Sequence, residues 1–231
     1  MRGQLRILSA NLWNGAAEPQ ALSEVIAASE PDAVLAQELS PEQATAIEAQ
    51  LPHGVLLPRR DMNGMGLALR RPARVAILQL PSRPALVARL SPEHWDALPA
   101  SLEIINVHMS APTRLGRLAL RRGQLAGLHR HLAGSRMRRV LAGDLNSFRL
   151  MPAYRSLRAH LHDAALARRR FGMPTWSPRA SWPRLLRIDH VLTEGVEVVD
   201  LEVLRIRGSD HSAVLATLRL ADVATGPPAR I

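Results

Sequence analysis

Two polar side chains that could act on one ligand follow a short apolar segment. Val140–Ala142 is expected to form a buried strand, and Asp144 and Asn146 come directly after it. Alternate side chains of an extended segment point the same way, so this carboxylate and amide can converge on one small ligand. Such pairs are common in loops, and the pattern gains meaning only if other strands end in the same way.

Polar residues interrupt or end five further apolar segments. Taken singly, Asn11 could cap a turn, His108 could be a satisfied core histidine, and Asp189 could cap a loop. Burying several unpaired acids would cost several kcal/mol each, so such acids need cations or partners. The simplest interpretation is one metal-binding pocket at one edge of the sheets. Its members would be Asn11, Glu38, His108, Asp144 with Asn146, Asp189, and Asp210 with His211.

The ligand types in this set indicate a hard cation. Carboxylates and an amide, with no cysteine and only two histidines, suit Mg²⁺ or Mn²⁺ better than Zn²⁺. Mg²⁺ usually takes one or two carboxylates, waters and a substrate phosphate. The remaining acids and histidines are then free for proton transfer and phosphate contact. This combination predicts metal-assisted hydrolysis of a phosphoester.

Composition limits the class of protein. The chain has 231 residues, enough for one large domain or two small ones, and 47% apolar content is typical of a soluble globular protein. No apolar run approaches the roughly 18 residues of a membrane span, and Met1–Gln4 shows no secretory signal, so we expect a cytoplasmic protein. The absence of cysteine excludes disulfides and thiolate metal sites.

The charge balance favours a phosphate-bearing partner. The net charge is +10, and all 30 basic residues are arginine. A GC-rich genome explains the replacement of lysine by arginine, but it does not explain the excess of bases over acids. A basic surface concentrates polyanions, and arginine binds phosphate in a fork geometry. The charge therefore favours a polyanionic or phosphorylated substrate.

The elements that must position these residues alternate between strands and helices. Helical spacing or an N-terminal proline predicts helices over 18–29, 41–51, 113–132 and 152–160. Apolar segments bounded by turn residues predict strands over 5–12, 33–36, 55–57, 66–70, 74–80, 85–90, 102–108, 138–145, 185–193, 196–206 and 213–220.

The longest predicted helix has an apolar stripe and a basic face. The stripe consists of Leu115, Leu118, Leu125, Leu128 and Leu132. The basic residues lie mostly off the stripe, and we interpret them as a solvated face rather than a binding surface. They are Arg114, Arg117, Arg121 and Arg122.

The order of the polar motifs resembles the endonuclease/exonuclease/phosphatase superfamily, which includes deoxyribonuclease I, exonuclease III, sphingomyelinases and inositol-phosphate 5-phosphatases. The motifs are Asn11, Gln37-Glu38, Asn106-Val107-His108, Gly143-Asp144-Leu145-Asn146, Arg187-Ile188-Asp189-His190 and Ser209-Asp210-His211. The resemblance runs from residue 5 to about 220, and the chain looks most like small bacterial members. It implies an α+β fold, a four-layer α/β/β/α sandwich of two mostly antiparallel sheets flanked by helices. We expect one domain over 1–220 and a loose tail over 221–231.

The resemblance also implies roles for the polar residues. Glu38 would be the chief metal ligand, with Asn11 beside it and Asp210 completing the acids on the metal side. The implied catalytic residues begin with Asp144, which would position the attacking water, and Asn146, which would orient Asp144 and the phosphate. His211 would contact the phosphate or act as base, and Asp189 would orient His211. His108 would be a phosphate donor or leaving-group acid.

One departure from the family pattern concerns His108. In deoxyribonuclease I the corresponding histidine is paired with a glutamate, and the segment Asn63–Arg70 offers none. This favours His108 as a phosphate donor over His108 as a general acid.

The substrate prediction depends on an irregular segment over 168–187. Trp176 and Trp182 lie among arginines there and could stack a base, although Trp176 could equally pack as core. The predicted substrate-binding residues are Asn106, Trp176, Trp182 and Arg187. The first hypothesis is a Mg²⁺- or Mn²⁺-dependent, nuclease-type phosphodiesterase that cleaves DNA or another nucleic acid as a monomer. The alternatives are hydrolysis of a small or lipid phosphoester, and a non-catalytic phosphate-ligand binder.

Overall fold

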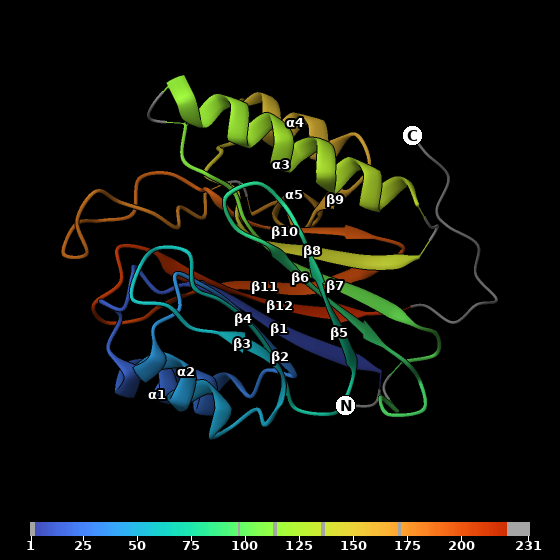
Figure 1. The fold of residues 1–231 in the computed structure, drawn as a ribbon. Coiled ribbons are helices and arrows are strands. Elements are labelled where there is room, and N and C mark those ends of the chain that lie inside the picture. Colours follow the sequence, from blue (N-terminus) through green and yellow to red (C-terminus); the bar gives the residue numbers. More distant parts are fainter. Residues whose placement is uncertain (1–2, 97, 113–114, 135–136, 171, 221–231) are drawn as a thin grey trace.

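Two six-stranded sheets pack face to face, and helices cover their outer faces (Figure 1). This computed structural model describes residues 3–220, apart from residues 97, 113–114, 135–136 and 171. The predicted loose tail lies outside the described residues. The layers confirm the predicted α/β/β/α sandwich, and each sheet contains a single parallel strand pair among antiparallel ones.

The first sheet has the strand order β11-β12-β1-β2-β4-β3. Only β1 and β2 run parallel within it, with Asn11 in register with Gln37. Its strands are β1 (Gln4–Asn11), β2 (Ala33–Gln37), β3 (His53–Leu57), β4 (Met65–Leu69), β11 (Glu197–Arg205) and β12 (Ser212–Arg219).

The second sheet has the order β5-β6-β7-β8-β10-β9. Here β7 and β8 form the parallel pair, with His108 in register with Asp144, and Asp189 at the start of β10 pairs with Asp144 from the other side. Its strands are β5 (Arg74–Leu78), β6 (Ala85–Leu90), β7 (Leu102–His108), β8 (Arg138–Asp144), β9 (His162–Asp163) and β10 (Asp189–Glu194).

Helices cross over between the parallel strands and cover the sandwich (Figure 1). The helices α1 (Pro19–Ser29) and α2 (Pro41–Glu48) lie on the first sheet, where Ser40 caps α2. The helices α3 (Leu115–Ala133) and α4 (Pro152–Arg158) lie on the second, and the short α5 (Ala164–Ala167) follows β9. No helix among the described residues is long and apolar enough to cross a membrane.

The core is divided into layers by the alternation of side chains along the strands. In β1, Leu5 and Ile7 enter the core between the sheets, whereas Leu8 packs under α1 and α2. A separate core lies under α3 and α4, where Leu128 and Leu157 are buried. Strands covered on both faces must be apolar at nearly every position, which explains their continuous apolar segments.

The parallel pairs place the functional ends of strands together. Because β1 and β2 run in the same direction, as do β7 and β8, the carboxyl ends of each pair meet at one edge of their sheet. Asn11, His108 and Asp144 each end a strand at these edges. Packing of the two sheets then brings Asn11 to Asp144, 133 positions away in the sequence.

Three predictions about elements differ from the structure. The strand expected over 185–193 starts only at Asp189, because the backbone of Leu185 and Leu186 bonds instead to Trp176. In the predicted leucine stripe of α3, Leu118 is 39% exposed. The short elements β9 and α5 were not expected, since each is too brief to produce a period in the sequence.

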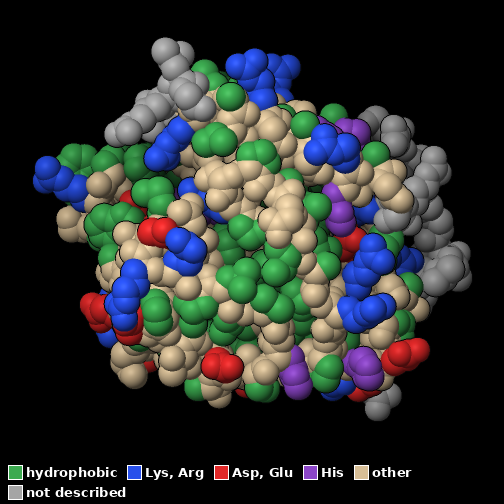
Figure 2. Space-filling model, viewed as in Figure 1, with side chains coloured by type: hydrophobic (Ala, Val, Ile, Leu, Met, Phe, Trp, Pro, Cys, Tyr) green, Lys and Arg blue, Asp and Glu red, His purple; other side chains and the backbone are tan. Residues whose placement is uncertain are grey.

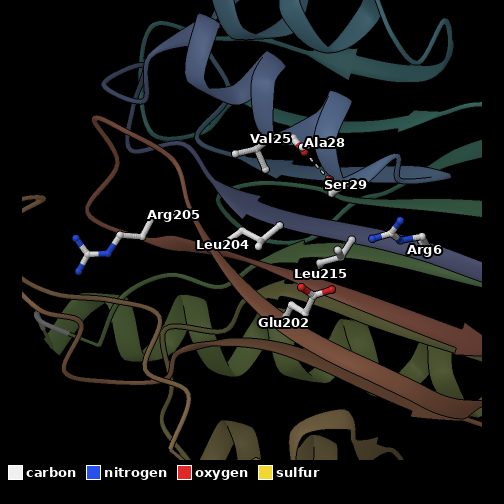
Figure 3. A pocket seen from close by; sticks show the side chains of 8 residues that line it. All are labelled: Arg6, Val25, Ala28, Ser29, Glu202, Leu204, Arg205 and Leu215. Carbon is white, nitrogen blue, oxygen red and sulfur yellow. Dashed lines mark hydrogen bonds between the residues drawn. The ribbon is translucent and has the colours of Figure 1, made fainter.

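Two hollows among the described residues lie away from the strand ends. One of about 230 Å³ lies between α1 and β11, lined by residues that include Val25, Glu202 and Leu204 (Figure 3). Another of about 390 Å³ lies between α2 and β3. No predicted site residue lines either hollow. On the face shown in Figure 2, basic side chains are scattered and hydrophobic ones gather near the centre, so that face carries no single basic patch.

Candidate active site

Asn11 joins the two sheets at their polar edges. Its side-chain amide donates to Asp144 Oδ2 at 3.1 Å and to Glu38 Oε1 at 3.4 Å, and its Oδ1 accepts from the backbone N–H of Trp13. One buried amide thus holds a carboxylate from each sheet. Glu38 directly follows β2 with a φ of 55°, a left-handed conformation that costs a non-glycine residue energy.

Hydrogen bonds, rather than strand alternation, bring Asp144 and Asn146 together. The strand β8 ends at Asp144, and Asn146 has a φ of 46°. Its backbone N–H donates to Asp144 Oδ1 at 2.7 Å, and its side-chain amide donates to Asp144 Oδ2 and to the backbone oxygen of Met109. Gly143 is required just before them, since a Cβ at its φ of 142° would lie 1.9 Å from the backbone oxygen of Val107. The two side chains do converge, but through a tight turn.

His211 and Asp189 form a buried ion pair. His211 Nδ1 lies 2.8 Å from Asp189 Oδ2, and both side chains are nearly inaccessible. Burial lowers the pKa of His211, but the charges of Asp189, Asp144 and Asp210 outweigh it and raise that pKa to about 9. The pair therefore presents a cationic imidazole to the neighbouring carboxylates of Asp144 and Asp210, which together with Glu38 and Asp189 form the acid cluster of the site.

Trp176 forms part of the wall of the site. Its indole N–H donates to Asp210 Oδ2 at 3.0 Å, and its ring lies 6.5 Å, centroid to centroid, from that of His211. The residue is half-buried, and its backbone bridges to Leu186 and His211. Trp176 therefore orients an acid of the cluster, whereas Trp182 on the same loop is 44% exposed with the Arg179 guanidinium over its ring.

The acids of the site are buried close together, which raises the pKa values of Asp144, Glu38 and Asp210. Burial and the neighbouring Asp189 raise the pKa of Asp144 to about 7. Burial also raises the pKa of Glu38 and that of Asp210. Asp210 Oδ1 is buried without a hydrogen-bond partner among the residues that the structure describes. A set of buried carboxylates with raised pKa values and an unsatisfied oxygen fits a divalent cation.

Two neighbouring sets of side chains could hold that cation. The predicted set is Glu38, Asp210 and Asn11, in which the charge of Asp210 contributes to the raised pKa of Glu38. A second set, Asp144, Asp189 and His211, offers ligand atoms that all lie within 4.8 Å of one another. A cation on the Glu38 side needs no change at His211, whereas His211 could ligate one only after losing its proton.

His108 lies between these acids and an arginine that the sequence did not reveal. Its Nε2 is 3.4 Å from Asp144 Oδ2 and 3.7 Å from Glu38 Oε1, and its Nδ1 contacts the buried guanidinium of Arg83. Burial first, and then the charges of Arg83 and His211, hold the pKa of His108 well below its usual range. Arg83 lies between β5 and β6, outside every strand-end motif. The only signal for it in the sequence was the missing glutamate partner of His108.

Two predicted substrate contacts are occupied by other bonds. Asn106 is fully buried, donates to the backbone oxygens of Ala36 and Gly66, and accepts from Gln37. Arg187 directs two N–H groups at the carboxylate of Asp163, at 3.0 and 2.7 Å. Asn106 ties one sheet to the other and Arg187 neutralises a buried acid, so we assign neither to substrate.

Arg121 supports the site from behind, contrary to the prediction of a solvated face. It is 7% exposed, and its guanidinium donates to the backbone oxygens of Ser110 and Leu145 and to Ser147 Oγ. These acceptors lie on the segments that follow β7 and β8. Arg121 therefore fixes the loops that present His108 and Asp144.

A second buried polar cluster, centred on Asp163, packs against the same loop. Burial by itself would raise the pKa of Asp163, but His190 and Arg187 outweigh it and hold that pKa far below its usual range. Tyr154 also donates to this carboxylate, and Asp163 caps α5 by accepting from the N–H of Ala165. His190 in turn contacts the backbone oxygen of Ser147 at 2.8 Å.

We expect Asp163→Asn to lower the free energy of unfolding by about 3 kcal/mol at neutral pH, because it leaves the half-buried Arg187 without its charge partner. An acid with a lowered folded pKa contributes stability that is complete above its unfolded pKa and is lost as pH falls below about 4. Urea unfolding across that range should show a smaller acid-side loss in the variant. Asp200→Asn, in an exposed pair with Arg170, is the control. Equal stability of both variants at neutral pH would contradict this assignment.

The sandwich and its strand-end cluster of carboxylates, amides and histidines define a class, the deoxyribonuclease I-like phosphoester hydrolases. The model of the Endonuclease/Exonuclease/phosphatase family matches residues 8–211, and the chain therefore belongs to this family. It is accordingly a metal-dependent hydrolase of phosphoester bonds. Comparison with curated protein sequences gives no match.

Solved structures confirm the fold. An endonuclease/exonuclease/phosphatase from Beutenbergia cavernae is 21% identical with a TM-score of 0.72, over 95% of this chain and 72% of that one. Humanized D. rerio TDP2 is 18% identical with a TM-score of 0.73, over 94% and 99% of the two chains. D. rerio TDP2 complexed with a single-strand DNA product is 17% identical with a TM-score of 0.69, over 94% and 99%.

Proposed function

We propose that this chain is a Mg²⁺-dependent, nuclease-type phosphodiesterase that cleaves DNA by attack of water on phosphorus. The observation that carries the proposal is the position of exposed aromatic side chains on the loops that also bear the site. Trp13 follows Asn11, Phe148 follows Asn146, and Trp182 precedes Asp189, with exposures of 38, 37 and 44%. Exposed rings beside a phosphate site suit nucleobases, which stack on aromatic faces.

The charge and the structural neighbours support the same substrate. A net charge of +10 concentrates polyanions at the surface. The DNA-product complex of D. rerio TDP2 shows that a similar fold accommodates a single strand. Mg²⁺ is the cation expected for carboxylate ligands that share it with a substrate phosphate.

In the proposed mechanism, Glu38 and Asp210 would hold the cation, with Asn11 beside them. A cation bound there would supply positive charge against the negative charge that develops on the phosphoryl oxygens. Asp144, fixed by Asn11 and Asn146, orients the attacking water and accepts its proton. The imidazole of His211, held by Asp189, donates to a phosphoryl oxygen. His108 donates to another from its Nε2. As the water oxygen bonds to phosphorus, the P–O bond to the leaving strand breaks, and the leaving oxygen takes a proton from solvent.

Cleavage of DNA should fall steeply with added salt. If the enzyme neutralises about three phosphates of a single strand, kcat/KM should drop roughly tenfold or more between about 50 and 200 mM salt. The measurement is the rate on a fluorescent oligonucleotide, with a small phosphodiester dye as control. Because the dye contacts few basic groups, its hydrolysis should change little. An equal salt response for both substrates would contradict nucleic-acid binding.

A second candidate substrate is a lipid phosphoester. The observation that favours it is the presence of exposed leucines on the same loops, since Leu150 is 67% and Leu185 is 58% exposed. A panel of single strands, duplex, RNA, sphingomyelin vesicles and simple phosphoesters, each with Mg²⁺, separates the two. Hydrolysis of the vesicles with every nucleic acid left intact would overturn the nuclease proposal and support the second.

A further inference from the structure

Arg83 is a buried arginine beside the candidate active site. It is 4% exposed, and its guanidinium contacts His108 Nδ1. Its Nε is buried without a hydrogen-bond partner among the described residues. Burying an arginine in this way is costly, so its remaining contact with His108 should have a purpose.

The direction of the hydrogen bond between the two side chains is fixed by chemistry. A guanidinium has only donors, so His108 Nδ1 must accept and cannot carry a proton. A neutral imidazole has one ring proton, so a ring whose Nδ1 is unprotonated carries that proton on Nε2. A glutamate in place of Arg83 would impose the opposite arrangement, with the proton on Nδ1 and a favourable site for a cationic ring.

The Nε2 of His108 points into the cluster. It lies 3.4 Å from Asp144 Oδ2, 3.7 Å from Glu38 Oε1 and 3.4 Å from the side-chain amide nitrogen of Asn146. A substrate phosphate bound among these groups would meet one N–H of the ring. That N–H can donate a hydrogen bond, but giving up its proton would leave an imidazolate.

We propose that Arg83 is a positioning residue that fixes His108 in the tautomer protonated at Nε2. His108 then donates a hydrogen bond to a phosphoryl oxygen and does not protonate the leaving group. The part that concerns phosphate rests on the proposed function, whereas the tautomer is a property of the protein alone. With an arginine rather than a glutamate beside it, His108 therefore acts as a hydrogen-bond donor and not as a general acid.

The first test is ¹⁵N NMR of the histidine rings in the full-length, metal-free protein at neutral pH. We expect His108, assigned by the signals missing from His108→Gln, to show the pattern of a neutral ring protonated at Nε2. In Arg83→Met the ring should lose this single tautomer. Arg139→Met removes a buried arginine at the opposite end of β8 and should leave the pattern unchanged. A wild-type ring protonated at Nδ1, or at both nitrogens, would overturn the proposal.

The second test is kinetic. Arg83→Met should lower kcat about 10²-fold, because a hydrogen-bond donor to the developing charge is no longer oriented. In Arg83→Ala, added guanidinium should restore part of the lost rate, and it should not do so in His108→Gln. Wild-type kcat in Arg83→Met would contradict the positioning role of Arg83. An equal response of Arg83→Ala and His108→Gln to guanidinium would contradict it too.

The two tests separate the failure of this inference from the failure of the proposed function. If no phosphoester in the panel is cleaved, the spectrum of the wild-type protein still decides the tautomer. If Arg83→Met does not fold, the wild-type spectrum and Arg83→Ala with guanidinium decide it. If DNA is cleaved while His108 carries its proton on Nδ1, the assignment of Arg83 and the donor role of His108 are wrong, and the nuclease proposal stands.

Discussion

Replacing Glu38 by glutamine is expected to reduce Mg²⁺-dependent cleavage of DNA by about 10³-fold or more, without loss of stability. The amide keeps the shape of the side chain and can still accept from Asn11, but it removes the charge that would bind the cation. Because burial raises the pKa of Glu38, its ionised form is unfavourable when no cation is bound. The neutral amide should therefore leave the metal-free protein equally stable or slightly more stable. Steady-state rates and thermal unfolding measure the two effects.

The control for this variant is Glu42→Gln. Glu42 is an exposed acid on α2 that pairs with Arg60 and lies outside the cluster, so its replacement should leave the rate unchanged. Added Mg²⁺ should raise the thermal midpoint of the wild type and of Glu42→Gln, since a ligand that binds only the folded state stabilises it. It should have little effect on Glu38→Gln. Full activity in Glu38→Gln would show that the cation does not depend on this carboxylate.

The second large effect is expected for His211→Gln, with a loss of about 10²–10⁴ in kcat. Glutamine can donate to a phosphoryl oxygen but cannot carry the positive charge that Asp189 stabilises in the imidazole. Asp189→Asn should lose a similar amount, because the histidine and its acid act as a unit. The double variant should then be no slower than the worse of the two single variants.

The exposed His53 provides the matched control for His211. His53→Gln should retain the wild-type rate. If the effects of His211→Gln and Asp189→Asn multiplied in the double variant, the two residues would be acting independently, and the ion pair would not be the functional unit.

The sequence pointed to polar residues at strand ends, and the structure brings several of them together. The parallel pairs place Asn11 beside the residue that precedes Glu38, and His108 beside Asp144. Face-to-face packing of the two sheets then brings Asn11 to Asp144. His211 joins them from the position just before β12, which runs antiparallel to β1. Strand ends of parallel neighbours share an edge, and this rule holds whatever the intervening residues are. The fold was predicted from the resemblance that these ordered motifs carry, and the family match confirms that resemblance.

Residues whose roles depend on contacts distant in sequence could not be predicted. Asn106 precedes a strand end by two positions, as a site residue would, yet its amide reaches from the second sheet to two backbone oxygens of the first. Arg121 is polar on a helix, which indicates exposure, yet the backbone oxygens of two loops face it. Arg83 lies in a turn, and only the position of His108 gives it a role.

The most direct test of the proposed function is cleavage of a single-stranded oligonucleotide in H₂¹⁸O, followed by mass spectrometry of the products. With Mg²⁺ present, we predict that ¹⁸O enters the phosphate end of the cleaved strand, because water attacks phosphorus. Chelation of the metal should abolish the reaction. Incorporation of ¹⁸O into the hydroxyl end, undiminished cleavage without metal, or an intact strand in the presence of Mg²⁺ would contradict the proposed reaction.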